Sequence, residues 1–134
     1  LVVGASTNKN DALRAGFSNY NKTMVNVFAP GEEIYSTVPE NKYEYLQGTS
    51  MASPVVAGAA AVLLAYMPDL KPSQIIEALV KTSNKSTANS FETYSQAGGV
   101  IDVEKAAQYA YNNFYQGKSN SKAKPAKAKK KMKA

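Results

Sequence analysis

An apolar stretch with no polar side, Val55 to Met67, constrains the fold of this chain more than any other feature. The small-residue run Gly48-Thr49-Ser50-Met51-Ala52-Ser53-Pro54 precedes it, and Pro68 follows it. We expect a helix here, with Ser50 or Thr49 as its side-chain cap and Pro54 in its first turn, where the missing N–H of proline costs little. A helix that is apolar on every face is buried all round, so the sequence predicts a helix through the centre of a layered α/β domain.

The rest of the pattern alternates between strands and helices. Strands are expected over residues 1–6 and 24–29, and a short extended piece over 43–46, with a turn-rich segment at 32–41 between them. An amphipathic surface helix is expected from Pro72, and a last helix after the N-cap Asp102, fading near Asn112 or Phe114. The apolar stretch is well short of the roughly 20 residues that span a bilayer. The sequence therefore predicts a globular α/β domain and no transmembrane segment.

The positive charge lies at one end of the chain. The formal net charge is +6, from 16 basic and ten acidic groups, but residues 118–134 hold eight Lys and no acid. Residues 1–117 then carry eight basic and ten acidic groups, a net charge of 8 − 10 = −2. We predict a domain over residues 1–116 and a disordered Lys-rich tail over 117–134. Such a tail either binds a polyanion through phosphate contacts or serves as a solubilising end.

Two absences exclude several kinds of chemistry. The chain has no Cys, which excludes disulfides and thiolate chemistry, and no His, which removes the commonest general base and transition-metal ligand. Ser50 is then the best candidate for catalysis, since a serine at a helix N-terminus lies among unpaired N–H groups that stabilise an oxyanion. From spacing alone, an ordinary helix cap is the better interpretation of Ser50, because serine is among the commonest caps.

The motifs around Ser50 change that balance. The run from Gly48 to Gly58 resembles the nucleophile signature of the subtilases, the subtilisin-like serine peptidases. Three other segments resemble the family in the same order along the chain: Arg14-Ala15-Gly16-Phe17-Ser18-Asn19, Val27-Phe28-Ala29-Pro30-Gly31 and Gly99-Val100-Ile101-Asp102. The resemblance covers about residues 1–112, and its several motifs together make it specific.

The resemblance implies roles for six residues around the motif. Ser50 is implied to be the catalytic nucleophile, with its own N–H in the oxyanion hole and Thr49 and Met51 adjacent. Leu46, Gln47 and Gly48 are implied to bind the substrate, the first two on its leaving-group side, although for Gln47 an ordinary edge-strand position is the better interpretation. No metal ligand is implied in this segment, and no cofactor; calcium, frequent in the family, is left open for the full domain.

The resemblance also implies what this chain lacks. It is expected to be the C-terminal part of a three-layer domain with a parallel sheet and a buried central helix that starts at the nucleophile. The family's Asp, His and side-chain oxyanion donor are expected upstream of Leu1, because the triad runs Asp, His, Ser along the chain. The implied function is a serine endopeptidase acting on polypeptides, exported to the cell surface, periplasm or medium, and inactive without its N-terminal part. The alternative is a catalytically inactive subtilase-like binding module with a polyanion-binding tail.

Overall fold

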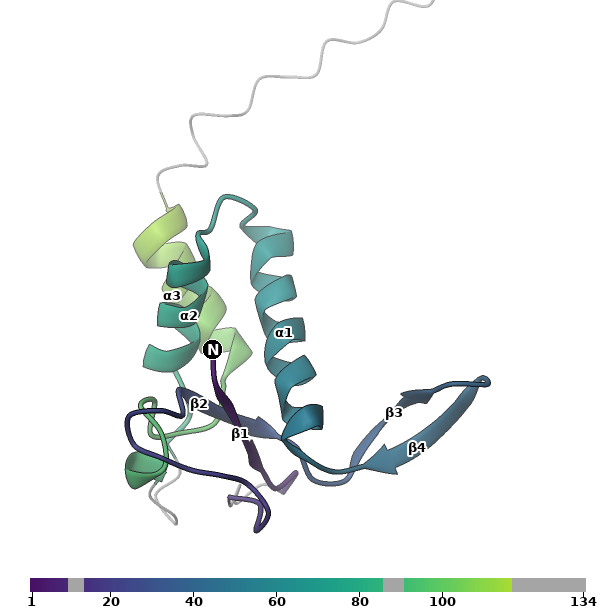
Figure 1. Cartoon of the computed structure of the whole chain (residues 1–134). Helices are drawn as coiled ribbons and strands as arrows, with labels where there is room; N and C mark the ends of the chain where they lie inside the picture. The colour runs from purple at the N-terminus through teal and green to yellow at the C-terminus, as the bar shows by residue number, and fades with distance from the viewer. Residues whose placement is uncertain (10–13, 86–90, 117–134) are drawn as a thin grey trace, which may run out of the picture.

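The computed structural model describes residues 1–9, 14–85 and 91–116 of the 134-residue chain. Its elements, in chain order, are β1 (Val3–Ser6), β2 (Val27–Pro30), β3 (Ile34–Val38), β4 (Lys42–Leu46), α1 (Thr49–Tyr66), α2 (Pro72–Lys81), the short 3₁₀ helix η1 (Phe91–Thr93), α3 (Val103–Ala110) and the π-helical turn η2 (Tyr111–Tyr115). In Figure 1 the three α-helices stand on the same side of β1 and β2, and β3 and β4 project away from them.

Strands β1 and β2 form a parallel pair, as predicted. Val3 lies opposite Val27 and Ser6 opposite Pro30, and Phe28 also makes a parallel bridge to Val100. The three residues Val27 to Ala29 are fully buried, because β2 lies between β1 and the segment around Val100. The α/β class and the parallel sheet are thus confirmed, although the helices of the described residues supply a layer on one face only.

The hairpin of β3 and β4 corrects one expectation. Residues 32–41 are predicted as turns, yet β3 pairs in antiparallel register with β4, with Tyr35 opposite Tyr45. The turn itself is confined to residues 39–41, where Glu40 and Asn41 adopt positive φ values. Pro39 and the polar residues around it give this segment the local pattern of a turn. The strand forms only through pairing with β4, which a local pattern does not record.

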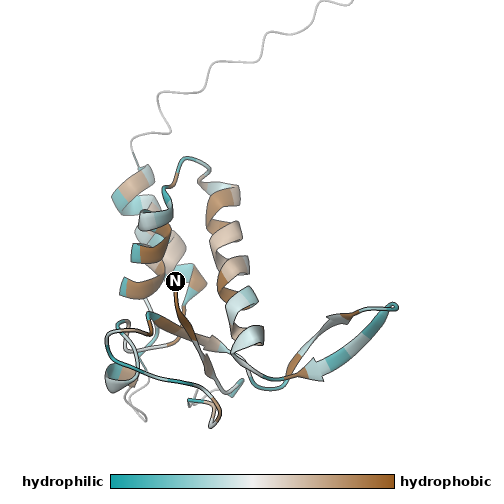
Figure 2. Cartoon of the chain, in the orientation of Figure 1, coloured by the Kyte–Doolittle hydropathy of each residue, from teal (hydrophilic) through white to brown (hydrophobic). Residues whose placement is uncertain are grey.

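Helix α1 is buried on one face rather than all round. Its buried residues, Ala52, Val56, Ala59 and Leu63, form a single stripe that packs over β1 and β2. On its other sides Val62, Leu64 and Tyr66 are exposed, and Figure 2 shows apolar colour along much of the helix. By length and hydropathy α1 would suit a membrane span, but its packing on β1 and β2 is that of a core helix. The all-round burial expected from its composition is therefore not reached within the described residues.

The start of α1 also differs from expectation. The N-cap is Gly48, and no side-chain hydrogen bond caps the helix, so neither Thr49 nor Ser50 acts as the predicted cap. The reason is geometric: Gly48 has a φ of 148°, and helical conformation already begins at Thr49. The predicted cap at Asp102 is confirmed, because its Oδ1 accepts the Lys105 N–H at 3.0 Å, a bond that lowers the pKa of the Asp102 carboxyl.

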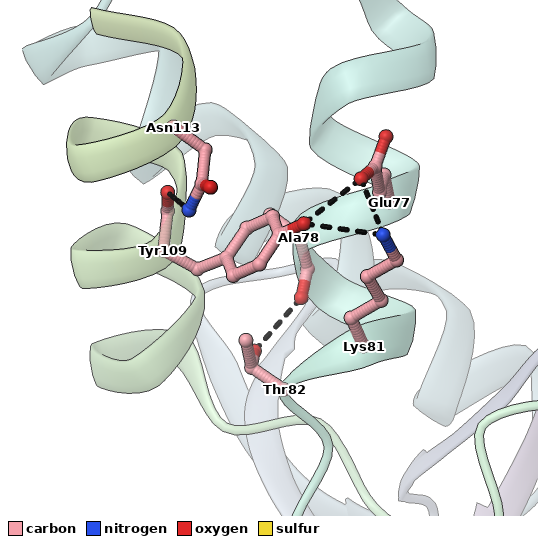
Figure 3. Close-up of polar contacts among 6 residues, drawn as sticks. All are labelled: Glu77, Ala78, Lys81, Thr82, Tyr109 and Asn113. Carbon is pink, nitrogen blue, oxygen red and sulfur yellow. Dashed lines mark hydrogen bonds and ion pairs between the residues drawn. The ribbon is translucent and has the colours of Figure 1, made fainter. Parts of the chain in front are cut away.

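A polar cluster joins α2 to α3 (Figure 3). Glu77 Oε1 accepts hydrogen bonds from Lys81 Nζ at 2.8 Å and from the Tyr109 hydroxyl at 2.9 Å. The two bonds lower the pKa of Glu77, and the bond to the Glu77 carboxylate raises the pKa of Lys81. The cluster lies at the solvent edge of the helix pair, so it orients the two helices rather than supplying a buried reactive group.

Two buried serines near the end of β1 are expected to change the stability in opposite directions when each is replaced by alanine. The Ser6 hydroxyl is fully buried and has no hydrogen-bond partner within the described part of the chain. The Ser18 hydroxyl, also buried, accepts the Ala5 N–H at 2.8 Å and donates to the Asn19 carbonyl at 3.0 Å. A buried polar group without a partner costs about 1–3 kcal/mol. We expect Ser6→Ala to raise the free energy of unfolding of the whole protein by about 1 kcal/mol.

The matched variant is Ser18→Ala, which leaves the Ala5 N–H without its acceptor. It is expected to lower the free energy of unfolding by about 1–3 kcal/mol. Urea unfolding of the whole protein and both variants measures the difference. A loss of stability in Ser6→Ala would contradict the assignment, because it would mean that the Ser6 hydroxyl has a partner in the intact protein.

Candidate active site

Ser50 lies in the first turn of α1 with an exposed side chain. Its hydroxyl makes no hydrogen bond to any described residue, so the ordinary structural role of a serine at this position, capping, is not in use. A free hydroxyl on the rigid end of a helix is accessible to a ligand and is held by the whole length of α1.

The turn before Ser50 is held by the end of β2. The Gly48 N–H donates to the Gly31 carbonyl at 2.7 Å, and the Gly31 N–H in turn donates to the Ser6 carbonyl at 2.9 Å. A Cβ on Gly31 would lie 2.6 Å from the Ala5 Cβ, 2.8 Å from the Gly48 carbonyl oxygen and 3.2 Å from the Ala52 Cβ. Gly31 thus permits a close approach that sets the position of the Ser50 turn against the sheet.

Backbone N–H groups beside Ser50 are available to an anion. The Met51 and Ala52 N–H groups donate to the Gly48 carbonyl, at 3.0 and 3.3 Å, whereas the Thr49 and Ser50 N–H groups form no hydrogen bond within the described residues. Such free donors at a helix N-terminus, reinforced by the helix dipole, stabilise a negative charge that develops next to them. Acyl transfer to a serine develops that charge on the carbonyl oxygen of the substrate.

A cavity of about 340 Å³ opens beside Ser50. Its lining residues come from the hairpin and from the first two turns of α1: Ile34, Ser36, Thr37, Leu46, Ser50, Met51, Pro54 and Val55. Of the six residues predicted for the site, Leu46, Ser50 and Met51 line this cavity together. Gln47, Gly48 and Thr49 do not line it; the Gly48 backbone instead holds the turn before Ser50 through its hydrogen bonds to Gly31, Met51 and Ala52. Local spacing explains this grouping, because β4 ends only four residues before Ser50.

Two features of the site lie outside the sequence prediction. One is Gly31, taken from the sequence only as the end of a strand, and the other is β3, whose Ile34, Ser36 and Thr37 line the cavity. Both come from chain segments well before Ser50 and reach it through tertiary contacts. Pro30-Gly31 after an apolar strand is the one sequence signal that could have indicated a close approach.

A second hollow, of about 370 Å³, lies between α1, α2 and β1. Its walls are almost entirely apolar: Leu1, Val3, Ser53, Val56, Ala57, Ala60, Leu64, Leu70, Pro72, Ile75, Ile76 and Leu79. It holds no titratable side chain, so it contributes apolar surface rather than chemistry. Within the described residues no group of three or more Asp, Glu, His or Cys side chains could hold a metal ion. The Lys-rich tail over 117–134, with its predicted disorder and polyanion contact, lies outside the described residues.

Comparison with known proteins agrees with the motifs. The model of the subtilase family matches residues 1–122. The chain is 45% identical over 109 residues to subtilisin DY from Bacillus licheniformis, covering 81% of this chain and 37% of that relative. It is 37% identical over 120 residues to the cell wall-associated protease of Bacillus subtilis, covering 86% and 13%. Among solved structures, fervidolysin from Fervidobacterium pennivorans matches with a TM-score of 0.66 and 32% identity over 79% of this chain and 18% of that one.

These matches and the α/β fold with its helix-borne serine place the chain in the class of serine peptidases. Within that class the chain belongs to the subtilase family. It spans 37% or less of the length of each of these three relatives.

Proposed function

We propose that this chain carries the nucleophile of a serine endopeptidase, with Ser50 attacking the carbonyl carbon of a peptide bond. The observation that supports it best is the free Ser50 hydroxyl beside the unpaired Thr49 and Ser50 N–H groups. The Ser50 Oγ forms an ester with the acyl part of the substrate, the amine leaves with a proton, and water then hydrolyses the ester. The Thr49 and Ser50 N–H groups stabilise the oxyanion that forms during acylation of Ser50 and again during hydrolysis of the ester.

The base that takes the Ser50 proton must come from outside this chain, which has no His. We assign it to a His–Asp pair in a segment upstream of Leu1, and we expect the chain alone to be inactive. Two apolar surfaces support the presence of a further segment packed against this chain: the hollow between α1 and α2, and the exposed Val62, Leu64 and Tyr66. Apolar surface of this extent is normally covered. The missing part of the same domain is the proposed cover, and calcium remains a prediction for that part. We also propose an extracellular, periplasmic or cell-surface location, which the similarity to the cell wall-associated protease of Bacillus subtilis supports.

Labelling with a fluorophosphonate probe tests the proposal. The probe reacts with activated serines only, so we expect peptide mapping of the labelled whole protein to find the label on Ser50. The labelled species should be much larger than the 14.4 kDa of this chain. A matched sample of residues 1–134 alone should stay unlabelled, because it lacks the base. If the folded whole protein is not labelled at Ser50, the peptidase proposal fails and the alternative of an inactive binding module with a basic tail replaces it.

A further inference from the structure

The two faces of the β3–β4 hairpin carry different side chains, because successive residues of a strand point to opposite sides. One face carries three exposed tyrosines whose rings contact one another: Tyr35, Tyr43 and Tyr45. The other, which we call the cavity face, includes two cross-strand pairs: Ile34 with Leu46, and Ser36 with Glu44. Three of the four hairpin residues that line the cavity beside Ser50 belong to the cavity face, and no tyrosine lines it. The cavity face is therefore the side of the hairpin that a substrate at Ser50 can reach.

Glu44 lies at the rim of this cavity. In the antiparallel register it is directly opposite Ser36, which lines the cavity, so the Cβ atoms of the two residues are about 5 Å apart. It also precedes Leu46 by two residues on the same face of β4, a distance of about 7 Å along the strand. The Glu44 side chain is exposed and makes no hydrogen bond or ion pair within the described part of the chain. Its carboxylate is therefore available to a ligand that extends out of the cavity.

The charges around the cavity leave Glu44 unopposed. The eight residues that line the cavity carry no charged side chain. The next residue of β4 on the cavity face is Lys42, towards the tip of the hairpin, and its ammonium lies 2.8 Å from the Glu40 carboxylate. That ion pair has no net charge, so the net charge of the cavity face comes from Glu44. A negative charge at the rim of an uncharged cavity favours a cationic group on the ligand.

We propose that Glu44 is a specificity-determining residue that binds a Lys or Arg side chain of the polypeptide substrate, about two or three residues from the cleaved bond. The spacing follows from strand geometry, because an extended substrate advances about 3.3 Å per residue and Glu44 lies about 7 Å beyond Leu46. An ammonium or guanidinium group forms charge-assisted hydrogen bonds with a carboxylate. The inference rests on the proposed peptidase function, since it names a preference of that same site.

Cleavage of a matched peptide set by the whole protein tests the inference. The parent peptide has Gln at the three positions on either side of the cleaved bond, and each probe replaces one Gln with Lys. Mass spectrometry identifies the bond that is cut. The probe with Lys two or three residues from the bond should have a kcat/KM about threefold to fivefold above the parent, the size expected for one partly exposed ion pair. The ratio should fall as NaCl is added, because salt screens exposed charges.

Variants of Glu44 assign the preference to this residue. Glu44→Gln should bring the ratio of the Lys probe to the parent to about one, and Glu44→Lys should reverse it in favour of a Glu probe at the same position. Each ratio is taken within one variant, so a partly unfolded preparation does not change it. Glu33→Gln is the matched control, because Glu33 is an exposed carboxylate just before the paired residues of β3. It should keep the wild-type ratio.

Three results would overturn the inference. One is equal cleavage of all probes and the parent by the wild-type protein. Another is a Lys preference that survives in Glu44→Gln and Glu44→Lys. The third is a preference that Glu33→Gln abolishes as well, because the selecting charge would then not be that of Glu44 alone.

The two proposals can fail separately. Binding of fluorescent versions of the peptides to the whole protein with Ser50→Ala, measured by anisotropy, needs no turnover. If Ser50 resists the fluorophosphonate probe, the peptidase proposal fails, while tighter binding of the Lys peptide that Glu44→Gln abolishes would leave Glu44 standing as a site for basic peptides. If Ser50 is labelled and no Lys preference appears, the role of Glu44 alone is refuted.

Discussion

In the whole protein, Ser50→Ala is expected to lower kcat for a peptide substrate by on the order of a millionfold, the scale known for subtilisin itself, a relative, and not a value obtained from this structure. The reason is that alanine has no oxygen with which to form the acyl-enzyme. The unpaired Thr49 and Ser50 N–H groups remain in the variant, so residual hydrolysis above the rate in water is expected. Initial rates with a chromogenic peptide, at matched protein concentration, measure the loss.

Ser53→Ala is the control for this prediction. Ser53 is an exposed serine on the same helix, one turn further along, and it faces the apolar hollow rather than the cavity beside Ser50. Because Ser53 lies among apolar residues outside the cavity beside Ser50, the loss of its hydroxyl is expected to change the rate by about twofold or less. Turnover retained in Ser50→Ala, or lost equally in Ser53→Ala, would exclude Ser50 as the nucleophile.

Gly31→Ala is expected to lower kcat/KM by about a hundredfold, although Gly31 does not touch the substrate. The added Cβ would meet the Ala5 Cβ, the Gly48 carbonyl oxygen and the Ala52 Cβ, the first two at less than 3.0 Å. None of these atoms is the end of a flexible side chain, so the backbone must shift. A shift of about 1 Å in the turn that holds Ser50 is enough for a hundredfold loss.

Gly16→Ala is the matched control, because a Cβ on Gly16 meets no atom within 4 Å. The rate of Ser50 labelling by the fluorophosphonate probe should fall in Gly31→Ala and stay near wild type in Gly16→Ala. Circular dichroism shows whether each variant is folded. If Gly31→Ala is folded and labels at the wild-type rate, the positioning role of Gly31 is wrong.

The helices were predictable because their signals are local. Pro72 opens α2 and Asp102 caps α3, as their positions in the sequence indicate. At the start of α2 the Lys71 ammonium has no atom that can accept a hydrogen bond, so the side-chain part of the cap comes from Gln74, whose Oε1 accepts the Lys71 N–H at 2.9 Å. Such contacts reach across three or four residues, which is the range that a local pattern describes.

The strand β3 and the role of Gly31 were not predictable in the same way. Tyr35 and Thr37 sit in a segment rich in turn residues, and they form a strand because Tyr45 and Tyr43 lie opposite them. The burial of α1 was overestimated for a related reason: composition reports that a face is apolar, but not whether another segment covers it. The exposed Val62 and Tyr66 show this difference.

The sequence by itself determined the family, the serine that carries the proposed chemistry, the absence of a histidine base from this chain, and the starts of α2 and α3. Each of these depends on which residues are present or on spacings within a few positions. Only the tertiary structure decided that Gly31 packs against the Gly48 turn, that β3 completes the cavity beside Ser50, and that three tyrosines share one exposed face. These features depend on contacts between segments far apart in the chain, whose free energy comes from packing and pairing that no local pattern records.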